Sequence, residues 1–225
     1  PMFEGPIDVV GDVHGEHEAL HRLLERLGYD QDAQHPEGRR LVFLGDLVDR
    51  GPDSPGVALD VARWCAAGRA QCVLGNHELN ALVGERKHGN GWFFGESEPI
   101  GKGRPAFDCQ LATPEQRAEI IRFFSSLPVA LERADLRLVH AAWIETVIPT
   151  LRAAEDALAL YWERRRALVA SLEADGTAQA AAEAWETWGQ ALRDPDATLP
   201  LLDAIAEEDL RRQMGNPVRV ATSGA

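Results

Sequence analysis

Three short clusters of side chains that can bind metal ions occur in order along the first half of the chain. They read GDVHG at 11–15, GDLVDRG at 45–51 and GNHE at 75–78, and a fourth candidate, His140, follows later. Carboxylate and amide oxygens suit Mg²⁺ and Mn²⁺, whereas imidazole nitrogens suit Mn²⁺, Fe²⁺ and Zn²⁺. The mixture of Asp, Asn and His therefore indicates a site for divalent metal ions.

Each cluster taken alone has an ordinary structural explanation. A Gly-Asp pair after a strand is often only a turn, Asn tolerates left-handed backbone, and a single His at a strand end is more often structural than a ligand. The combination favours chemistry, because a metal-capable side chain follows glycine directly in all three clusters.

Short apolar runs precede these clusters and predict the strands that position them. The predicted strands lie at 7–10, 41–44, 71–74 and 136–139. Helical patterns follow the first three, at about 16–27, at about 54–67 with Ser54 as the N-cap, and from about Glu78. This alternation predicts an α/β fold with a largely parallel sheet, in which ligands bind at the carboxyl ends of the strands. The four clusters should therefore converge on one edge.

The second half of the chain has a different pattern. Residues 87–108 are rich in Gly and Pro and predict a long surface loop. Thr113 and Gln116 predict a helix start with a capping box, and the runs at 129–133 and 136–140 predict a hairpin. Two helices interrupted at Gly176, a third near 202–213 and a last strand at 218–221 complete the expected elements.

Charge and composition limit the function classes. The formal charge of −13 argues against broad nucleic-acid binding, which needs a basic surface, but not against a small phosphorylated substrate. Three cysteines without a CxxC pair, the lack of a long apolar run and the lack of a secretory pattern predict a cytoplasmic protein without a membrane span. The oligomeric state stays open.

The three motifs in this order, followed by LVHAAW at 138–143, resemble the phosphoprotein-phosphatase branch of the calcineurin-like metallophosphoesterases. The resemblance extends over about 7–143 and implies an α/β/β/α sandwich of two mixed β-sheets flanked by helices. It also implies two divalent ions, which we expect to be Mn²⁺, with Fe, Zn or Mg as alternatives. A water that bridges the ions would attack the phosphorus.

The resemblance assigns roles residue by residue. It implies that Asp12 and His14 bind the first metal and that Asp46 bridges both. It places Asn76 and His140 on the second metal.

The same resemblance gives the remaining matched residues catalytic roles. It implies that His77 protonates the leaving group, that Asp49 orients His77, and that Arg50 holds the phosphate.

The sequence departs from the family pattern at its end. The family has a further histidine motif that supplies the second metal, but no histidine follows His140 here, and His88 is the one loop candidate to replace it. We expect a single domain over 1–225 with a helical cap at about 151–213, and a missing C-terminal part of the family domain.

Two further groups allow more than one interpretation. His17 and His21 lie one helical turn apart, a spacing that can bind metal, although we expect a solvated helix face. The aromatic residues 92–94 could stack on a substrate base or pack beneath the loop.

Several functions are compatible with these residues. The main prediction is a serine/threonine-phosphatase-like hydrolase of phosphate monoesters, because Asp49, Arg50 and Glu78 fit that branch. The alternatives are a dinucleoside-polyphosphate hydrolase, which we rank lower because its bacterial representatives tend to lack the acidic residue at Asp49, a nucleic-acid-end phosphatase, and a catalytically impaired binding protein.

Overall fold

The computed structural model describes residues 2–96, 108–194 and 196–224. The chain divides into two compact units, residues 1–141 and 142–225, and each is described by itself. Every residue predicted for the metal site belongs to the first unit.

A parallel sheet forms the centre of the first unit. Its strands are β1 (Ile7–Val10), β2 (Arg40–Phe43) and β3 (Ala70–Cys72), in the order β1-β2-β3. Val9 lies opposite Val42, and Phe43 lies opposite Cys72. The three predicted strands are confirmed, with bounds shifted by no more than two residues.

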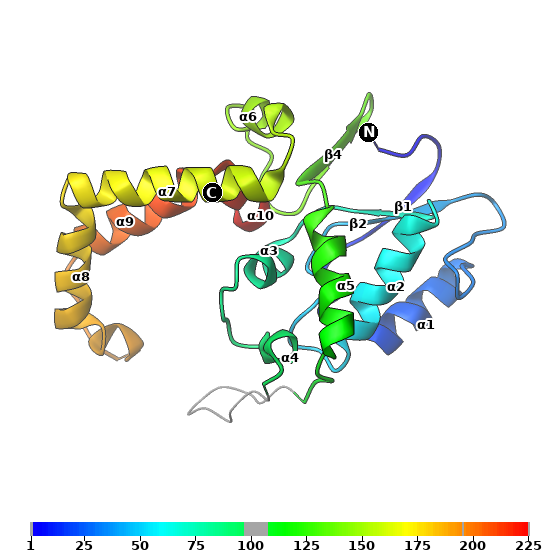
Figure 1. The fold of residues 1–225 in the computed structure, drawn as a ribbon, viewed down its shortest axis with the longest axis horizontal. Coiled ribbons are helices and arrows are strands. Elements are labelled where there is room, and N and C mark those ends of the chain that lie inside the picture. Colours follow the sequence, from blue (N-terminus) through cyan, green and yellow to red (C-terminus); the bar gives the residue numbers. More distant parts are fainter. Residues whose placement is uncertain (1, 97–107, 195, 225) are drawn as a thin grey trace. The chain divides into compact units, whose positions relative to one another are not determined.

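Helices α1 (His17–Leu27), α2 (Ser54–Ala66) and α5 (Pro114–Ser125) lie side by side in this unit (Figure 1). Phe43 of β2 stacks on Trp64 of α2 with ring centroids 6.2 Å apart, which joins the sheet to this helix layer. The capping box of Thr113 and Gln116 at the start of α5 is confirmed.

The predicted N-cap of α2 is wrong. Asp53 caps the helix, because its Oδ1 accepts a hydrogen bond from the Gly56 N–H at 2.8 Å. Ser54 is turned the other way, and its hydroxyl accepts from the Asp49 N–H at 2.9 Å. The serine thus binds the loop that precedes the helix.

A second, antiparallel sheet packs against the parallel one. It consists of β4 (Ala130–Arg133) and β5 (Leu136–Val139), which form the predicted hairpin. Leu131 joins a buried cluster with Val42 and Val73, on the opposite side of β2 from Phe43 because successive side chains of a strand alternate. The calcineurin-like fold class with two sheets is confirmed, and among the described residues one sheet is parallel and the other antiparallel.

Two short helices follow β3. Helix α3 (Asn76–Leu82) begins directly after Gly75, and α4 (Gly91–Phe94) lies in the segment predicted as a surface loop. The loop prediction is wrong at 91–94, because Trp92 and Phe93 are only 0 % and 4 % exposed. Residues 97–107 of the predicted loop lie outside the described part of the chain.

All the regular elements that the structure describes in the second unit are helices. It contains α6 (Ile148–Ala153), α7 (Ala157–Ala174), α8 (Thr177–Trp188), a 3₁₀ turn at Ala191–Arg193, α9 (Asp203–Met214) and α10 (Pro217–Ser223). The predicted helices are confirmed, and their role as a cap stays a prediction. No helix in the described ranges has the length and apolar character needed to cross a membrane.

The predicted strand at 218–221 is wrong. The segment is part of α10, whose start is fixed by Asn216, since the Asn216 side chain accepts from the Val218 N–H at 3.1 Å. Pro217 follows at the first helical position, where its missing N–H costs nothing.

Candidate metal centre

The carboxyl ends of the three parallel strands bring the first three motifs together. The loops after β1 and β2 are joined by backbone hydrogen bonds, because the N–H groups of Val13 and His14 both donate to the Asp46 carbonyl at 3.0 Å. His140 follows β5 of the other sheet and still reaches this edge, where its Nδ1 lies 2.7 Å from the Leu44 carbonyl. The predicted convergence of the four clusters is thus present.

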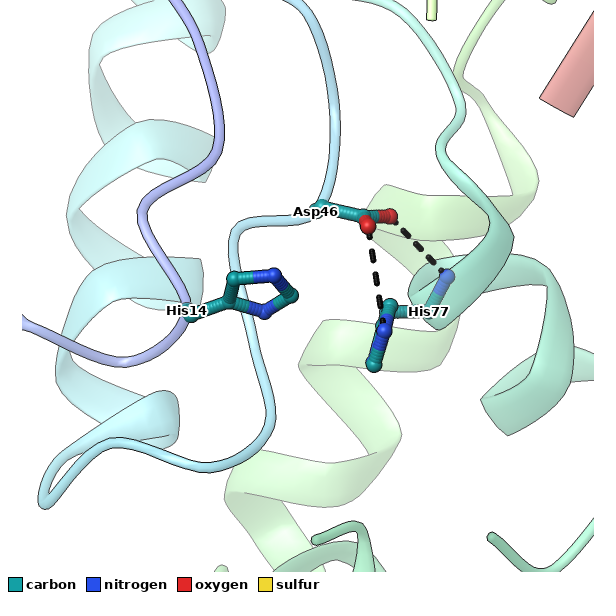
Figure 2. Close-up of side chains that lie close together, drawn as sticks. All are labelled: His14, Asp46 and His77. Carbon is teal, nitrogen blue, oxygen red and sulfur yellow. Dashed lines mark hydrogen bonds and ion pairs between the residues drawn. The ribbon is translucent and has the colours of Figure 1, made fainter. Parts of the chain in front are cut away.

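Asp46 lies at the centre of this site (Figure 2). Its Oδ1 accepts from the backbone N–H of His77 at 3.1 Å, and its Oδ2 lies 3.7 Å from the Nε2 of the same residue. The His14 ring approaches from the loop after β1, with its centroid 4.8 Å from that of the His77 ring. Asp46 itself is only 4 % exposed.

Asp46 belongs to two groups of possible metal ligands. One group contains His14, Asp46 and His77, and the other contains Asp12, Asp46 and His140, with one ligand atom from each member within 4.8 Å of the others. Asp12 Oδ2 also lies 3.6 Å from His14 Nε2, so the two groups are neighbours. A carboxylate shared by two donor groups is the arrangement expected of a residue that bridges two ions.

Asn76 lies on the His140 side of Asp46. The His140 Nε2 lies 3.2 Å from Asn76 Oδ1 and 3.4 Å from Asp46 Oδ2. Asn76 and His77 are adjacent, yet the amide of Asn76 points to His140 while the imidazole of His77 points to Asp49. This divergence agrees with the different roles expected for the two residues.

The imidazoles of this site are held by their Nδ1 atoms. His14 Nδ1 lies 3.1 Å from the Val48 carbonyl, and His140 Nδ1 lies 2.7 Å from the Leu44 carbonyl. A carbonyl that accepts from Nδ1–H fixes the tautomer and leaves Nε2 available toward the site, as in protein metal sites. The Nε2 atoms of His14 and His140 thus face the site, which is the orientation expected if the two residues bind metal.

The electrostatics of the site favour a bound cation. Burial alone would raise the pKa of Asp46, but the imidazoles of His140 and His77 outweigh it, so the pKa lies below its ordinary value. Burial alone would lower the pKa of His140, but the Asp46 carboxylate raises it to about 9. Surroundings that stabilise a proton on His140 also stabilise a metal cation beside the same carboxylate.

Asp49 and His77 form a buried pair. His77 Nδ1 donates to Asp49 Oδ2 at 2.6 Å, and Asp49 is 0 % exposed. The other carboxylate oxygen, Oδ1, accepts from the indole N–H of Trp92 at 2.6 Å. Burial opposes protonation of His77, but the hydrogen bond that His77 donates to Asp49 and the charges of Asp46 and Asp49 outweigh it and raise the pKa of His77.

Arg50 lies beside the two imidazoles that face the site. Its Nη1 donates to His14 Nε2 at 3.2 Å, and its Nη2 donates to His77 Nε2 at 3.3 Å. Arg50 is exposed, so its guanidinium fork remains accessible to an incoming phosphate group.

The buried Glu78 side chain holds together the loops that follow β2 and β3. Its Oε2 accepts from the N–H groups of Asp46 at 2.8 Å and Gly75 at 3.0 Å, and its Oε1 accepts from Leu47 at 2.8 Å. Burial raises the pKa of Glu78 to about 7, and the charge of Asp46 acts in the same direction. The role of Glu78 is thus to position the backbone around Asp46.

The backbone of the site is strained at its functional residues. Positive φ angles occur at His14 (48°), Asp46 (48°), Asp49 (75°) and Arg50 (71°), and the one other non-glycine case in the described chain is Ala33. Such conformations cost of order 1–3 kcal/mol each and persist where surrounding contacts impose them. Hydrogen bonds between the loops supply that constraint here.

Gly45 and Gly75 allow the second and third motifs to touch. A Cβ on Gly45, whose φ is +88°, would lie 2.5 Å from the Gly75 nitrogen, and one on Gly75 would lie 2.6 Å from Glu78 Oε2. Neither position can hold a larger side chain without separating the loops.

A family model described as calcineurin-like phosphoesterase matches residues 5–146 of the chain. The match extends over more than half of the sequence and includes every residue of the site. The chain belongs to the calcineurin-like phosphoesterase family.

Several curated proteins resemble the chain over part of its length. A bis(5'-nucleosyl)-tetraphosphatase (asymmetrical) of Halalkalibacterium halodurans is 44% identical over 125 residues, which cover 53% of this chain and 48% of that protein. One of Bacillus velezensis is 35% identical over 147 residues, with coverages of 60% and 55%. A symmetrical bis(5'-nucleosyl)-tetraphosphatase of Ralstonia nicotianae is 34% identical over 139 residues, with coverages of 60% and 41%.

The chain spans about half the length of these relatives. Among solved structures, a putative diadenosine tetraphosphatase is similar with a TM-score of 0.42 and 27% identity, covering 63% of this chain and 52% of that one.

The donor set fits the divalent ions that this phosphoesterase family implies. Carboxylate oxygens come from Asp12 and Asp46, an amide oxygen from Asn76, and imidazole nitrogens from His14 and His140. This mixture of oxygen and nitrogen ligands suits Mn²⁺, Fe²⁺ and Zn²⁺. The five predicted ligands are together in one place, and their assignment to individual ions stays a proposal.

The structure also shows what the sequence did not reveal. His88 belongs to none of the metal-capable groups found among the described residues, so nothing supports it as the replacement for the missing histidine. Trp92 is buried, as in the packing alternative for residues 92–94, but its hydrogen bond to Asp49 had no signal in the sequence.

His17 and His21 do not simply face solvent. Both converge on Asp60 of α2, a residue that no motif had singled out.

Proposed function

We propose that the protein is a metal-dependent hydrolase that cleaves dinucleoside polyphosphates, with a pair of Mn²⁺ ions at Asp46. The observation that carries the proposal is that two metal-capable groups share the buried Asp46 carboxylate, with the Arg50 guanidinium beside them. The substrate class is supported by the relatives that are named bis(5'-nucleosyl)-tetraphosphatases.

The metal ions, when bound, would lower the pKa of a water molecule and neutralise charge on the phosphate oxygens. The chain's own residues orient the reactants. Arg50 lies beside both imidazoles, and its planar guanidinium can bind two oxygens of a phosphate group placed there. Glu78 and the two glycines keep the loops close, so the donors need little rearrangement during reaction.

The nature of the leaving group separates two candidate functions. Cleavage of a polyphosphate chain releases a nucleotide phosphate, a weakly basic group that needs little protonation. Cleavage of a phosphoserine ester releases an alkoxide, which needs a proton from a general acid. The hydrogen bond of 2.6 Å between Asp49 and His77 favours such an acid and keeps the phosphomonoesterase as a second candidate.

A direct comparison of substrates tests the proposal. Diadenosine tetraphosphate, a phosphoserine peptide and a 3′-phosphorylated oligonucleotide are incubated with the full chain and Mn²⁺, and the products are separated by ion-exchange chromatography. We expect the diadenosine compound to be hydrolysed with the highest kcat/KM. Two ADP molecules would indicate symmetrical cleavage, and ATP with AMP asymmetrical cleavage.

The Asp46→Asn variant serves as the control for contaminating hydrolases, since it should lose the activity. Faster hydrolysis of the phosphoserine peptide, with the diadenosine compound left intact, would contradict the proposal and support the second candidate.

A further inference from the structure

A second group of metal-capable side chains lies between α1 and α2. His17 and His21 are four residues apart and therefore project from the same face of α1. Their Nε2 atoms lie 2.9 and 2.6 Å from the same oxygen, Oδ2 of Asp60 on α2. The two rings stand edge to face with centroids 4.6 Å apart. Three ligand atoms thus meet at one point, and none belongs to the Asp46 centre.

The chemistry of this donor set differs from that of the Asp46 centre. Two imidazoles and one carboxylate form a set that Zn²⁺ commonly takes in proteins, with water in a fourth position. In a tetrahedral site with bonds of about 2.0–2.1 Å, neighbouring donor atoms are roughly 3.3 Å apart. The two imidazoles therefore need to move less than about 1 Å from Asp60 Oδ2 to admit an ion.

The surroundings prepare these side chains for an ion. His17 and His21 are each 32 % exposed at the side chain and Asp60 is 16 % exposed, so an ion can enter while the ligands stay ordered. Arg63 Nη2 holds the other oxygen of Asp60, Oδ1, at 2.9 Å and leaves Oδ2 toward the imidazoles. Asp53 Oδ2 lies 3.7 Å from His17 Nδ1, so a second carboxylate is near the other nitrogen of this ring.

We propose that His17, His21 and Asp60 form a zinc-binding site that links α1 to α2, separate from the Asp46 centre. This site lies next to the loop that carries His14. The Gly15 carbonyl accepts from both the His17 N–H at 2.9 Å and the Asp53 N–H at 3.0 Å, so the first turns of both helices meet at this loop. An ion held here would stiffen the helix pair that supports the loop.

The test separates this site from the Asp46 centre. In the full chain, Asp46→Asn and His140→Gln together remove ligands of that centre. The protein is dialysed against Zn²⁺ or Co²⁺, and bound metal is measured by elemental analysis and by the visible absorption of tetrahedral Co²⁺. We expect one equivalent of Zn²⁺ to remain, and the further change His21→Gln to remove it.

Matched controls exclude trivial explanations. His35→Gln removes an imidazole elsewhere on the first unit and should leave the bound equivalent unchanged. Circular dichroism and Tm without metal should be the same for the His21→Gln and His35→Gln proteins, which shows that the ligand variant folds. Zn²⁺ should raise Tm in the His35→Gln protein but not in the His21→Gln protein.

Two results would overturn the proposal. If the chain without the Asp46 ligands binds no Zn²⁺, the three side chains are only a hydrogen-bonded ion network. If His21→Gln leaves the bound Zn²⁺ and the Co²⁺ spectrum unchanged, the ion lies elsewhere.

Discussion

At the scale of single residues, side chains that are adjacent in the sequence of the site have different partners. Asn76 and His77 are consecutive, but one side chain points to His140 and the other to Asp49. Asp46 lies between them and is the one residue common to both metal-capable groups of the site. Predictions at this scale therefore separate metal binding from proton transfer.

Asp46→Asn should be the most damaging single change to metal binding. The amide keeps the shape of the side chain but removes the charge that both donor groups share. Metal affinity should fall by more than the ~10–100-fold that follows loss of a residue that only orients a ligand. Elemental analysis of the purified variant measures this, and two tightly held ions in it would rule out a bridging role.

His77→Asn should keep both metals and still lose activity selectively. General acid catalysis contributes typically 10²–10⁴-fold, and most where the leaving group is a strong base. We therefore expect a loss of about that size on phosphoserine and a much smaller loss on nitrophenyl phosphate. Both rates are measured with metal content in the same preparation.

The outcome for His77 has two informative alternatives. An equal loss on both substrates with the ions retained would show that His77 is not the acid. Loss of the ions would place His77 among the ligands, which its presence in a group with His14 and Asp46 also allows.

At the scale of elements, one ion pair ties together the start of the sheet. Asp8 of β1 accepts hydrogen bonds from Tyr29 Oη and Arg39 Nε, both at 2.7 Å, and a second one from the Arg39 guanidinium. Tyr29 follows α1 and Arg39 precedes β2, so a single carboxylate joins three elements. Arg39, against the opposing effect of burial, holds the pKa of Asp8 below its ordinary value of 3.8.

This pair predicts a pH-dependent share of stability. A carboxyl whose pKa is depressed by folding stabilises the protein above its unfolded pKa, and that contribution is lost as the pH falls through the folded pKa. Asp8→Asn should therefore lower Tm by a few degrees at pH 7, with a constant difference down to about pH 5. Below the ordinary value of 3.8 the difference from the parent should shrink.

Thermal melts of both proteins across this pH range check the prediction. Glu25→Gln on the exposed side of α1 is the control for loss of a surface carboxylate and should have little effect on Tm. A Tm difference for Asp8→Asn that stays constant into acid would show that the ion pair is not its cause.

The sequence predicted those elements whose signals are local. Apolar runs that end at glycine revealed β1 to β3, and the Thr113 capping box revealed α5. The run at 218–221 misled because its valines favour strands, whereas the Asn216-Pro217 start signal decided for helix. The contact of the two sheets through Leu131 depends on distant residues and could not be derived from local pattern.

The same distinction applies to the site. The convergence of candidate ligands that directly follow a strand was predicted, because parallel strands present their carboxyl ends at one edge. The support of Asp49 by Trp92 spans 43 residues of sequence, and the convergence on Asp60 joins two helices. Such tertiary contacts have no signature in spacing.

At the scale of the whole molecule, the metal centre should couple activity to folding. Its candidate donors come from loops after three strands of one sheet and one strand of the other, so we expect the ions to bind the folded chain and not the unfolded one. A ligand that binds only the folded state stabilises the protein against unfolding by about 2.7 kcal/mol at a concentration of 100 times Kd.

Exhaustive chelation should therefore abolish hydrolysis of nitrophenyl phosphate and lower Tm, and added Mn²⁺ should restore both. Calorimetry and the hydrolysis rate are followed in one titration, with Asp46→Asn as the control whose Tm should not respond to added Mn²⁺. Full activity after complete metal removal would contradict the metal-dependent mechanism and would turn attention to the Asp49–His77 pair as the group that activates water.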